Sequence, residues 1–306
     1  MRRLLLWAAR NDWLSRTVPR LPFARRAVRR FMPGETLDEA LAAAERHRDL
    51  GIATVFTFLG ENVTDLEAAR RDAEHYHGVL DRVHERGLDT EISVKLTHFG
   101  LEIDPAVAAA SLEGLARHAA QTGNWVWIDM EGSAYTESTV ALFERTRPGH
   151  ENLGLCLQAY LRRTPADVER LLPLLPAIRL VKGAYDEPGT IAHRGRAAVD
   201  AAFVETGEQL LHGLRDGRVS RFIAATHDVA LIERLADAAE SLGLAPSAVE
   251  VQMLYGIRAD QQRRLHSMGF EVRALIAYGE AWYAWYLRRL AERPANLLFA
   301  LRQLLP

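Results

Sequence analysis

The stretch IRLVKGAY occupies residues 178–185 and joins a short apolar run to an abrupt lysine and glycine. Such a run, ended by a glycine, is typical of a strand that is buried on both faces of a parallel sheet. Similar runs alternate with longer amphipathic stretches along the chain: ATVFTFL (53–59), TEISVKL (90–96), WVWIDM (125–130), LGLCLQ (153–158), RFIAAT (221–226), VEVQML (249–254) and FEVRALI (270–276). Eight strand–helix units predict an α/β fold, a closed (β/α)₈ barrel of the TIM type.

Helix-starting residues precede several of the amphipathic stretches, namely Thr64, Asp104 followed by Pro105, and Asp228. An N-terminal helical arm is expected in front of the barrel, and a helical tail over Pro294 to Leu305 behind it. The predicted domains are therefore a basic arm, residues 1–34, and a catalytic barrel, residues 35–306.

The composition is that of an ordinary globular protein, with 48% apolar and 25% charged residues in 306. The single cysteine, Cys156, excludes a disulfide scaffold and a zinc site of several thiolates. His227 lacks the histidine and cysteine partners that a transition-metal site needs, so no metal is predicted. No apolar run approaches the roughly 20 residues of a membrane-spanning helix. We expect a soluble, cytoplasmic protein.

Charge is unevenly distributed along the chain. Residues 1–34 hold nine arginines and one acid, Asp12, a balance of +8, whereas the rest of the chain carries −10. The prolines at 19, 22 and 33 favour a solvated arm of short helices. A transit peptide, and an arm that holds the protein at the inner face of the membrane against anionic lipid, stay open as alternatives. No nucleic-acid partner is expected.

Lysine is nearly absent, since two lysines stand beside 36 arginines. Both of them, Lys95 and Lys182, come where an apolar run ends. An ammonium group is compact and can lose its proton, unlike a guanidinium. We therefore expect that the chemistry at these two positions requires an ammonium group and not a guanidinium.

The ends of the other predicted strands are also polar. Because active sites of this fold lie at the carboxyl ends of the strands, these residues should meet at one mouth: Lys95, Asp129, Glu131, Gln158, Arg179, Lys182, Thr226 and His227. The set suits an anionic substrate or a cofactor phosphate. Asp129 would orient a cation or exchange a proton, and a structural ion pair is the alternative. Glycine motifs for two-part nicotinamide binding or for a P-loop are absent from the sequence.

A helical stretch, AYGEAWYAWYLRRLAERP, follows the last predicted strand at residues 277–294. Helical spacing brings Glu292 within reach of both Arg288 and Arg289. Two adjacent arginines braced by one carboxylate would clamp a substrate carboxylate. A surface salt-bridge ladder is the alternative.

These motifs, in order, resemble those of the bacterial single-function proline dehydrogenases: FLGENV, SVKLT, DMEGS, LQAYL, RLVKGAY, ATHD, QMLYG and RRLAERPAN. The resemblance runs from about residue 34 to the C-terminus. It implies a barrel that binds FAD non-covalently and oxidises L-proline to Δ1-pyrroline-5-carboxylate by hydride transfer from C5 to flavin N5. It also implies a quinone or similar electron acceptor, and a pyrroline-5-carboxylate dehydrogenase stays open as a partner.

The resemblance also implies roles for individual residues. Lys95, Arg288 and Arg289 would bind the substrate carboxylate, Asp129 would orient the charged network, and Arg179 would donate near flavin N5. Apolar walls that exclude water would include Tyr185 and Leu254. The flavin contacts would fall on Met130, Gln158, Lys182, Gly183, Ala184, Thr226 and His227.

One motif departs from the family. Where the family usually reads R-x-Y-x-P-Y-G, residues 273–279 read RALIAYG, so that Leu275 replaces a pocket tyrosine and Ala277 a proline. Leucine keeps the bulk and drops the hydroxyl, which leaves a related cyclic amino acid or a proline derivative open as the substrate. A Schiff-base aldolase with Lys182 as nucleophile, and a barrel of this family that has lost turnover, also stay open.

Overall fold

The chain is described from a computed structural model over residues 2–9, 11–60 and 63–292. Eight parallel strands close into one barrel, each pairing with the next along the chain, and β8 pairing with β1. The strands are β1 (Ala53–Phe58), β2 (Thr90–Val94), β3 (Val126–Ile128), β4 (Leu153–Gln158), β5 (Ala177–Val181), β6 (Arg221–Ala225), β7 (Val249–Leu254) and β8 (Val272–Tyr278). Every strand falls within or overlaps a predicted apolar run, and the predicted (β/α)₈ barrel is confirmed.

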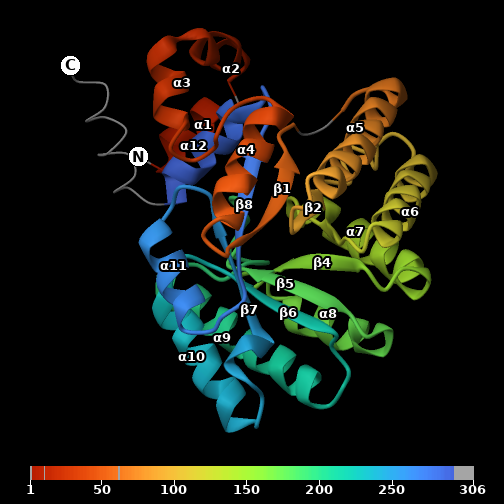
Figure 1. The fold of residues 1–306 in the computed structure, drawn as a ribbon, viewed down its shortest axis with the longest axis vertical. Helices are drawn as coiled ribbons and strands as arrows, with labels where there is room; N and C mark the ends of the chain where they lie inside the picture. The colour runs from red at the N-terminus through yellow and green to blue at the C-terminus, as the bar shows by residue number, and fades with distance from the viewer. Residues whose placement is uncertain (1, 10, 61–62, 293–306) are drawn as a thin grey trace.

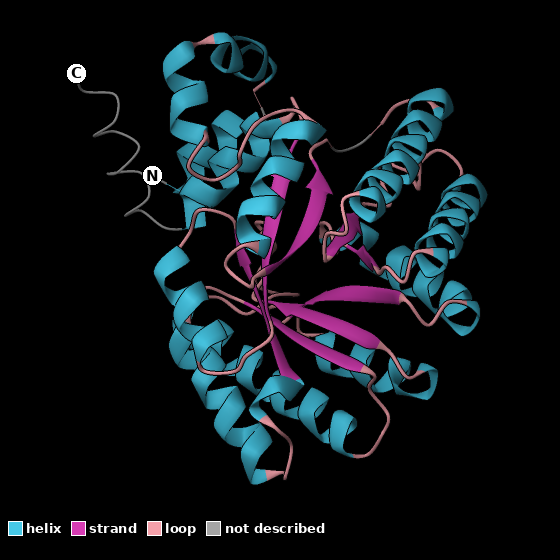
Figure 2. Cartoon of the chain, viewed as in Figure 1, coloured by secondary structure: helices cyan, strands magenta, loops and turns pink. Residues whose placement is uncertain are grey.

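Helices surround the strands (Figure 2). The barrel helices are α4 (Leu37–Arg48), α5 (Leu66–Glu85), α6 (Pro105–Gln121), α7 (Ser133–Thr146), α8 (Thr164–Leu171), α9 (Arg196–Arg215), α10 (Val229–Ser241), α11 (Ala259–Ser267) and α12 (Trp282–Glu292). Among the described residues, none of these helices is both long enough and apolar enough to cross a bilayer.

The helix starts agree with the predicted caps in part. Asp104 caps α6, with its carboxylate accepting from the Ala106 N–H at 2.9 Å. For α5 the predicted cap was one residue too early, because Asp65 and not Thr64 accepts from Ala68 N–H, at 2.8 Å. Asp228 precedes α10 as predicted, but its carboxylate makes ion pairs instead of a cap.

The amino end of the barrel is filled by side chains. Trp127 is fully buried in the interior, where Gly154 makes room for it: a Cβ on Gly154 would lie 2.4 Å from the indole. Below it, the Arg221 guanidinium pairs with Glu91 at 2.9 Å and Glu250 at 2.5 Å. It also stacks 4.3 Å from the ring centre of Trp125. In the described part of the chain, these side chains fill the amino end of the barrel, and a cavity opens at the carboxyl ends of the strands.

The N-terminal arm forms α1 (Arg2–Ala9), α2 (Asp12–Thr17), a 3₁₀ turn η1 (Val18–Arg20) and α3 (Pro22–Val28). Figure 1 shows these helices beside α12, at the other end of the sequence. Apolar residues of the arm and of α12 form one buried cluster. The predicted tail, Pro294 to Leu305, lies outside the described residues.

The loop after β7 also contacts the end of the arm. Gly256 has φ +71°, and a Cβ there would lie 1.6 Å from the carbonyl oxygen of Arg30. Nearby, the Trp282 indole N–H donates to Glu35 at 2.8 Å. The segment around residue 30 is therefore fixed against both the β7 loop and α12.

Candidate active site

A cavity of about 1160 Å³ opens at the carboxyl ends of the strands. Fourteen of the seventeen site residues predicted from the sequence line it: Lys95, Asp129, Met130, Gln158, Arg179, Lys182, Gly183, Ala184, Tyr185, Thr226, His227, Leu254, Leu275 and Arg289. Glu131 does not line the cavity, and the side chains of Arg288 and Glu292 are not among those that the structure describes. The structure thus brings the predicted residues of seven strands and α12 to one space.

Asp129 is the centre of the charged group. It follows the short strand β3, and its Oδ1 accepts from the Ser93 hydroxyl at 2.9 Å and from Arg179 Nη2. Its Oδ2 lies 3.8 Å from Lys95 Nζ. One carboxylate therefore links the cation of β5 to the cation that follows β2.

Arg179 is 2% exposed and held from several sides. Its guanidinium donates to Ser93 Oγ at 2.8 Å and to Gln252 Oε1 at 3.4 Å. Burial alone would lower the pKa of Arg179, but the charge of Asp129, together with smaller contributions from other neighbouring groups, raises the pKa overall. The group therefore stays a fixed cation and does not exchange protons. Burial raises the pKa of the neighbouring Cys156 thiol.

A chain of hydrogen bonds crosses four strand ends beside the cavity. Glu131 is 4% exposed, and its two oxygens accept from the backbone N–H and the hydroxyl of Thr97, at 3.2 and 2.7 Å. The Glu131 carbonyl accepts from Gln158 Nε2 at 2.8 Å, and Gln158 Oε1 accepts from Ala184 N–H at 3.4 Å. Lys95 precedes Thr97 by two residues, so the chain connects the Lys95 turn with the β5 loop.

Lys182 lies in an ion-pair cluster that the sequence did not predict. Its Nζ pairs with Asp200 and, at 3.2 Å, with Asp228. Arg196 pairs with the same two carboxylates at 3.3 and 3.0 Å. Burial would raise the pKa of Asp228, but hydrogen bonding and charge from Lys182 and Arg196 lower it overall.

Ser93 and Gln252 are site residues that the sequence reasoning missed. Both line the barrel interior two residues before a predicted site residue, Lys95 and Leu254 respectively, which the period-2 alternation of strands could have shown. Gln252 is 3% exposed and lines the cavity, and its Nε2 has no hydrogen-bond partner in the described part of the chain.

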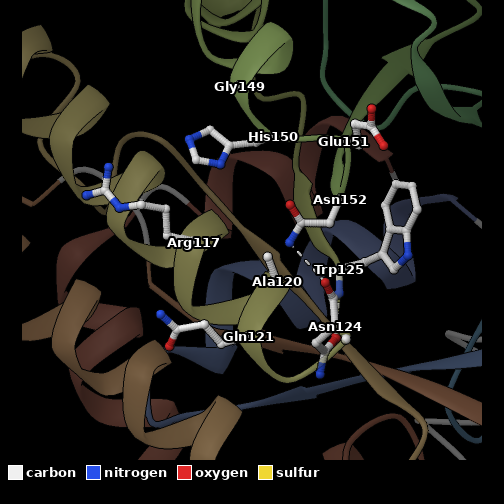
Figure 3. A pocket seen from close by; sticks show the side chains of 10 residues that line it. Arg117, Ala120, Gln121, Asn124, Trp125, Gly149, His150, Glu151 and Asn152 are labelled. Carbon is white, nitrogen blue, oxygen red and sulfur yellow. Dashed lines mark hydrogen bonds between the residues drawn. The ribbon is translucent and has the colours of Figure 1, made fainter.

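A second pocket, of about 600 Å³, lies at the amino ends of β3 and β4. Figure 3 shows its walls, which include Arg117, Trp125 and His150, and the hydrogen bond of 3.0 Å from Asn152 to the Asn124 carbonyl. None of the described site residues lines it. The pocket at the strand carboxyl ends is therefore the candidate active site.

Comparison with known proteins shows the family of the chain. Residues 40–302 match the family model described as Proline dehydrogenase. The chain belongs to the proline dehydrogenase family. It is 32% identical to Proline dehydrogenase 1 of Bacillus subtilis, over 100% of this chain and 99% of the relative. To the Proline dehydrogenase of Deinococcus radiodurans it is 33% identical, over 90% and 89% of the two chains.

Comparison with solved structures shows the same barrel fold. Proline utilization A (PutA) of Bdellovibrio bacteriovorus, in a crystal structure inactivated by N-propargylglycine, superposes with a TM-score of 0.82 at 22% identity. The superposition covers 95% of this chain and 38% of that longer one. Family membership makes the chain an oxidoreductase of a flavin-dependent family, and neither an aldolase nor a dehydrogenase of a different ring substrate is favoured.

The residues present fit a large cofactor beside a small substrate. The cavity exceeds the roughly 300–1,000 Å³ that is usual for one small ligand. Gly183 lines the cavity with φ +121°, and a Cβ there would lie 2.3 Å from the Tyr160 ring, so this position has no room for a side chain. The buried Gln252 Nε2 offers an unused donor on the floor.

Proposed function

We propose that this chain oxidises L-proline to Δ1-pyrroline-5-carboxylate with non-covalently bound FAD. The observation that carries the proposal is that Lys95, Asp129, Arg179 and Arg289 line one cavity in a chain of the proline dehydrogenase family. When bound, the flavin supplies an electron-accepting ring that takes up a hydride.

Lys95 and Arg289 bind the substrate carboxylate from two sides, and Arg288, by its motif, belongs to the same clamp. A carboxylate held by two or more cations has a fixed orientation, so that its ring carbon is presented to the cofactor. Asp129 fixes the positions of the Lys95 and Arg179 side chains through its ion pairs with both.

With a flavin bound, Arg179 would supply a fixed positive charge beside the ring that accepts the electrons. A buried cation of this kind would lower the barrier because it needs no reorganisation during the reaction. Leu254, Leu275 and Tyr185 form apolar walls that exclude water from the reacting atoms.

Residues at the ends of β3, β4, β5 and β6 would hold the cofactor. Gln158 presents its side chain beside Glu131 and Ala184, and Thr226 and His227 follow β6. Lys182 and Arg196 place two positive charges near the mouth, which suits a pyrophosphate as well as the carboxylates that they pair with.

The electrons pass to a quinone or similar acceptor, and the reactive imine product suits a pyrroline-5-carboxylate dehydrogenase as the next enzyme. The test is to purify the chain, record its visible spectrum, and add a panel of cyclic amino acids without oxygen. We expect a yellow protein that L-proline bleaches. A colourless protein, or a yellow one bleached by another ring amino acid and not by proline, contradicts the proposal.

A further inference from the structure

The start of α7 is capped by a residue from a distant part of the chain. Its N-cap residue is Gly132, which has no side chain to accept a hydrogen bond. Glu187, in the loop after β5, takes this place: its Oε1 accepts from the Ser133 N–H at 2.8 Å, and its Oε2 from the Ser133 hydroxyl at 2.5 Å. A carboxylate at a helix N-terminus meets unpaired N–H groups and the positive end of the helix dipole. The Glu187–Ser133 pair therefore joins two loops that are 54 residues apart.

Both of these loops belong to the candidate active site. Asp129 to Gly132 connect β3 to α7, and Glu187 lies two residues after Tyr185. Asp129, Tyr185 and Glu187 all line the cavity. A Cβ on Gly132 would lie 3.7 Å from Glu187 Oε1 and 4.0 Å from the Tyr185 ring, so both side chains lie against this turn. The pair thus holds the Tyr185 ring next to the turn that carries Asp129.

The second half of the loop after β5 is fixed by its own backbone. The Arg162 N–H donates to the Ile191 carbonyl at 2.9 Å, and the His193 N–H donates to the Tyr160 carbonyl at 2.7 Å. Residues 191–193 are therefore tied to the loop after β4, whatever happens at Glu187.

The first half of the same loop, which carries Tyr185, has longer contacts with β4 and the loop after it. The Ala184 N–H donates to Gln158 Oε1, and the Tyr160 hydroxyl to the Tyr185 carbonyl, both at 3.4 Å. Hydrogen bonds of this length are weak. The contacts that Glu187 makes are much shorter, so this carboxylate is the firmer attachment of the half that faces the substrate.

We propose that Glu187 and Ser133 are positioning residues that hold the Tyr185 ring in place as a wall of the substrate site. They act through the loop and need not touch the substrate. This role rests on the proposed function, in which Tyr185 is one of the walls. A wall contacts the substrate ring before and during the reaction alike, so its loss raises KM and leaves kcat nearly unchanged.

A double-mutant cycle tests whether Glu187 acts through Tyr185. Glu187→Ala should raise the KM for proline about tenfold, with kcat within about twofold of the wild type. In the Tyr185→Ala background the same change should raise KM less than about twofold, because the wall is already gone. Ser133→Ala should raise KM as well, and Ser133→Thr, which keeps the hydroxyl, should resemble the wild type. The controls are Ser138→Ala, exposed on α7, and Glu205→Ala, exposed on α9, which should keep the wild-type KM.

Hydrogen exchange, followed by mass spectrometry, tests the attachment without any activity. In the purified protein the amides of residues 131–135 and 184–187 should exchange at least about tenfold faster in Glu187→Ala than in the wild type. The amides of residues 191–193 should exchange at the same rate in both, because their hydrogen bonds do not involve Glu187.

Each outcome decides. Unchanged exchange in residues 131–135 and 184–187 overturns the proposal, and so does an equal rise in KM with and without Tyr185. A lower melting temperature of Glu187→Ala with a wild-type KM also overturns it, because the pair would then be a helix cap alone. If the wild type does not oxidise proline while exchange rises in both segments, the proposed function is wrong and the positioning of the loop by Glu187 stands.

Discussion

Glu131 accepts two hydrogen bonds from one residue, Thr97, whose backbone N–H lies 3.2 Å from Oε1 and whose hydroxyl lies 2.7 Å from Oε2. Both residues are almost fully buried. Since Lys95 stands two residues before Thr97, this pair fixes the turn that carries the ammonium proposed to bind the substrate.

Thr97→Val removes the hydroxyl and keeps the shape. A buried carboxylate that loses one of its donors costs about 1–3 kcal/mol, and we expect part of this cost as a KM for proline raised about tenfold. Thr97→Ser keeps the hydroxyl and should resemble the wild type. A role in stability alone would lower the melting temperature of Thr97→Val and leave its KM unchanged.

Lys95→Ala and Arg289→Met remove cations that line the cavity. Loss of a charge-assisted hydrogen bond to the substrate carboxylate corresponds to about 10- to 100-fold in KM. The cofactor should stay bound, so both variants remain yellow. Steady-state kinetics with proline measure the effect, and kinetics like those of the wild type in both variants would remove these residues from the clamp.

Gly183→Ala tests the backbone that faces the proposed flavin. The new methyl group would meet the Tyr160 ring at 2.3 Å, at φ +121°. Gly195 in the same loop has φ +82° and nothing within 4 Å of its added Cβ, so Gly195→Ala carries the backbone strain without the clash. We expect flavin affinity about tenfold lower in Gly183→Ala than in Gly195→Ala, measured by the visible absorbance of protein at increasing FAD. Equal flavin affinity would contradict this role.

Gly256→Ala tests how tightly the arm is attached. Its Cβ would overlap the Arg30 carbonyl, whereas at Gly217, with φ +67°, an added Cβ meets nothing within 4 Å. A residue with a side chain at positive φ costs about 1–2 kcal/mol, which Gly217→Ala should show in urea unfolding. Gly256→Ala should cost at least about 2 kcal/mol more, because the backbone of the arm must move. If the two variants are equally stable, residues 1–34 are an independent unit.

The eight strands and their carboxyl ends were predictable because apolar runs and polar strand ends are local features of the sequence. Lys95, Asp129 and Arg179 could be placed together for that reason. The ion pairs of Lys182 with Asp200 and Asp228 could not, since they join three elements whose side-chain directions depend on how the helices pack. Asp228 is an example, because its place in the sequence predicts a cap of α10. In the structure its carboxylate pairs with Lys182 and makes no capping hydrogen bond.

The docking of the arm on α12 was also not predictable. The arginine-rich sequence showed a basic segment but not which face of it is apolar enough to pack, and α1 meets a helix nearly 280 residues away in the chain. Arg288 and Glu292 stay predictions, because their side chains lie outside the described residues.

His98 gives a prediction about pH and stability. It is fully buried, and burial, followed by the charge of Lys95, lowers the pKa of His98 to about 3. In the unfolded chain the pKa is about 6.5. The unfolded state therefore takes up a proton at a pH where the folded state does not, and the stability that is present above pH 6.5 is lost as the pH falls toward 3.

Between pH 7 and pH 5 this single group should account for about 2 kcal/mol of the loss in unfolding free energy. In His98→Gln the loss over this interval should be smaller by that amount, measured by urea unfolding of the holoenzyme at the two pH values. His84→Gln is the matched control, because His84 is exposed on α5, and it should keep the wild-type dependence. If the unfolding free energies of the wild type and His98→Gln depend on pH in the same way, the prediction is wrong. The pKa of His98 would then be the same in the folded and the unfolded chain.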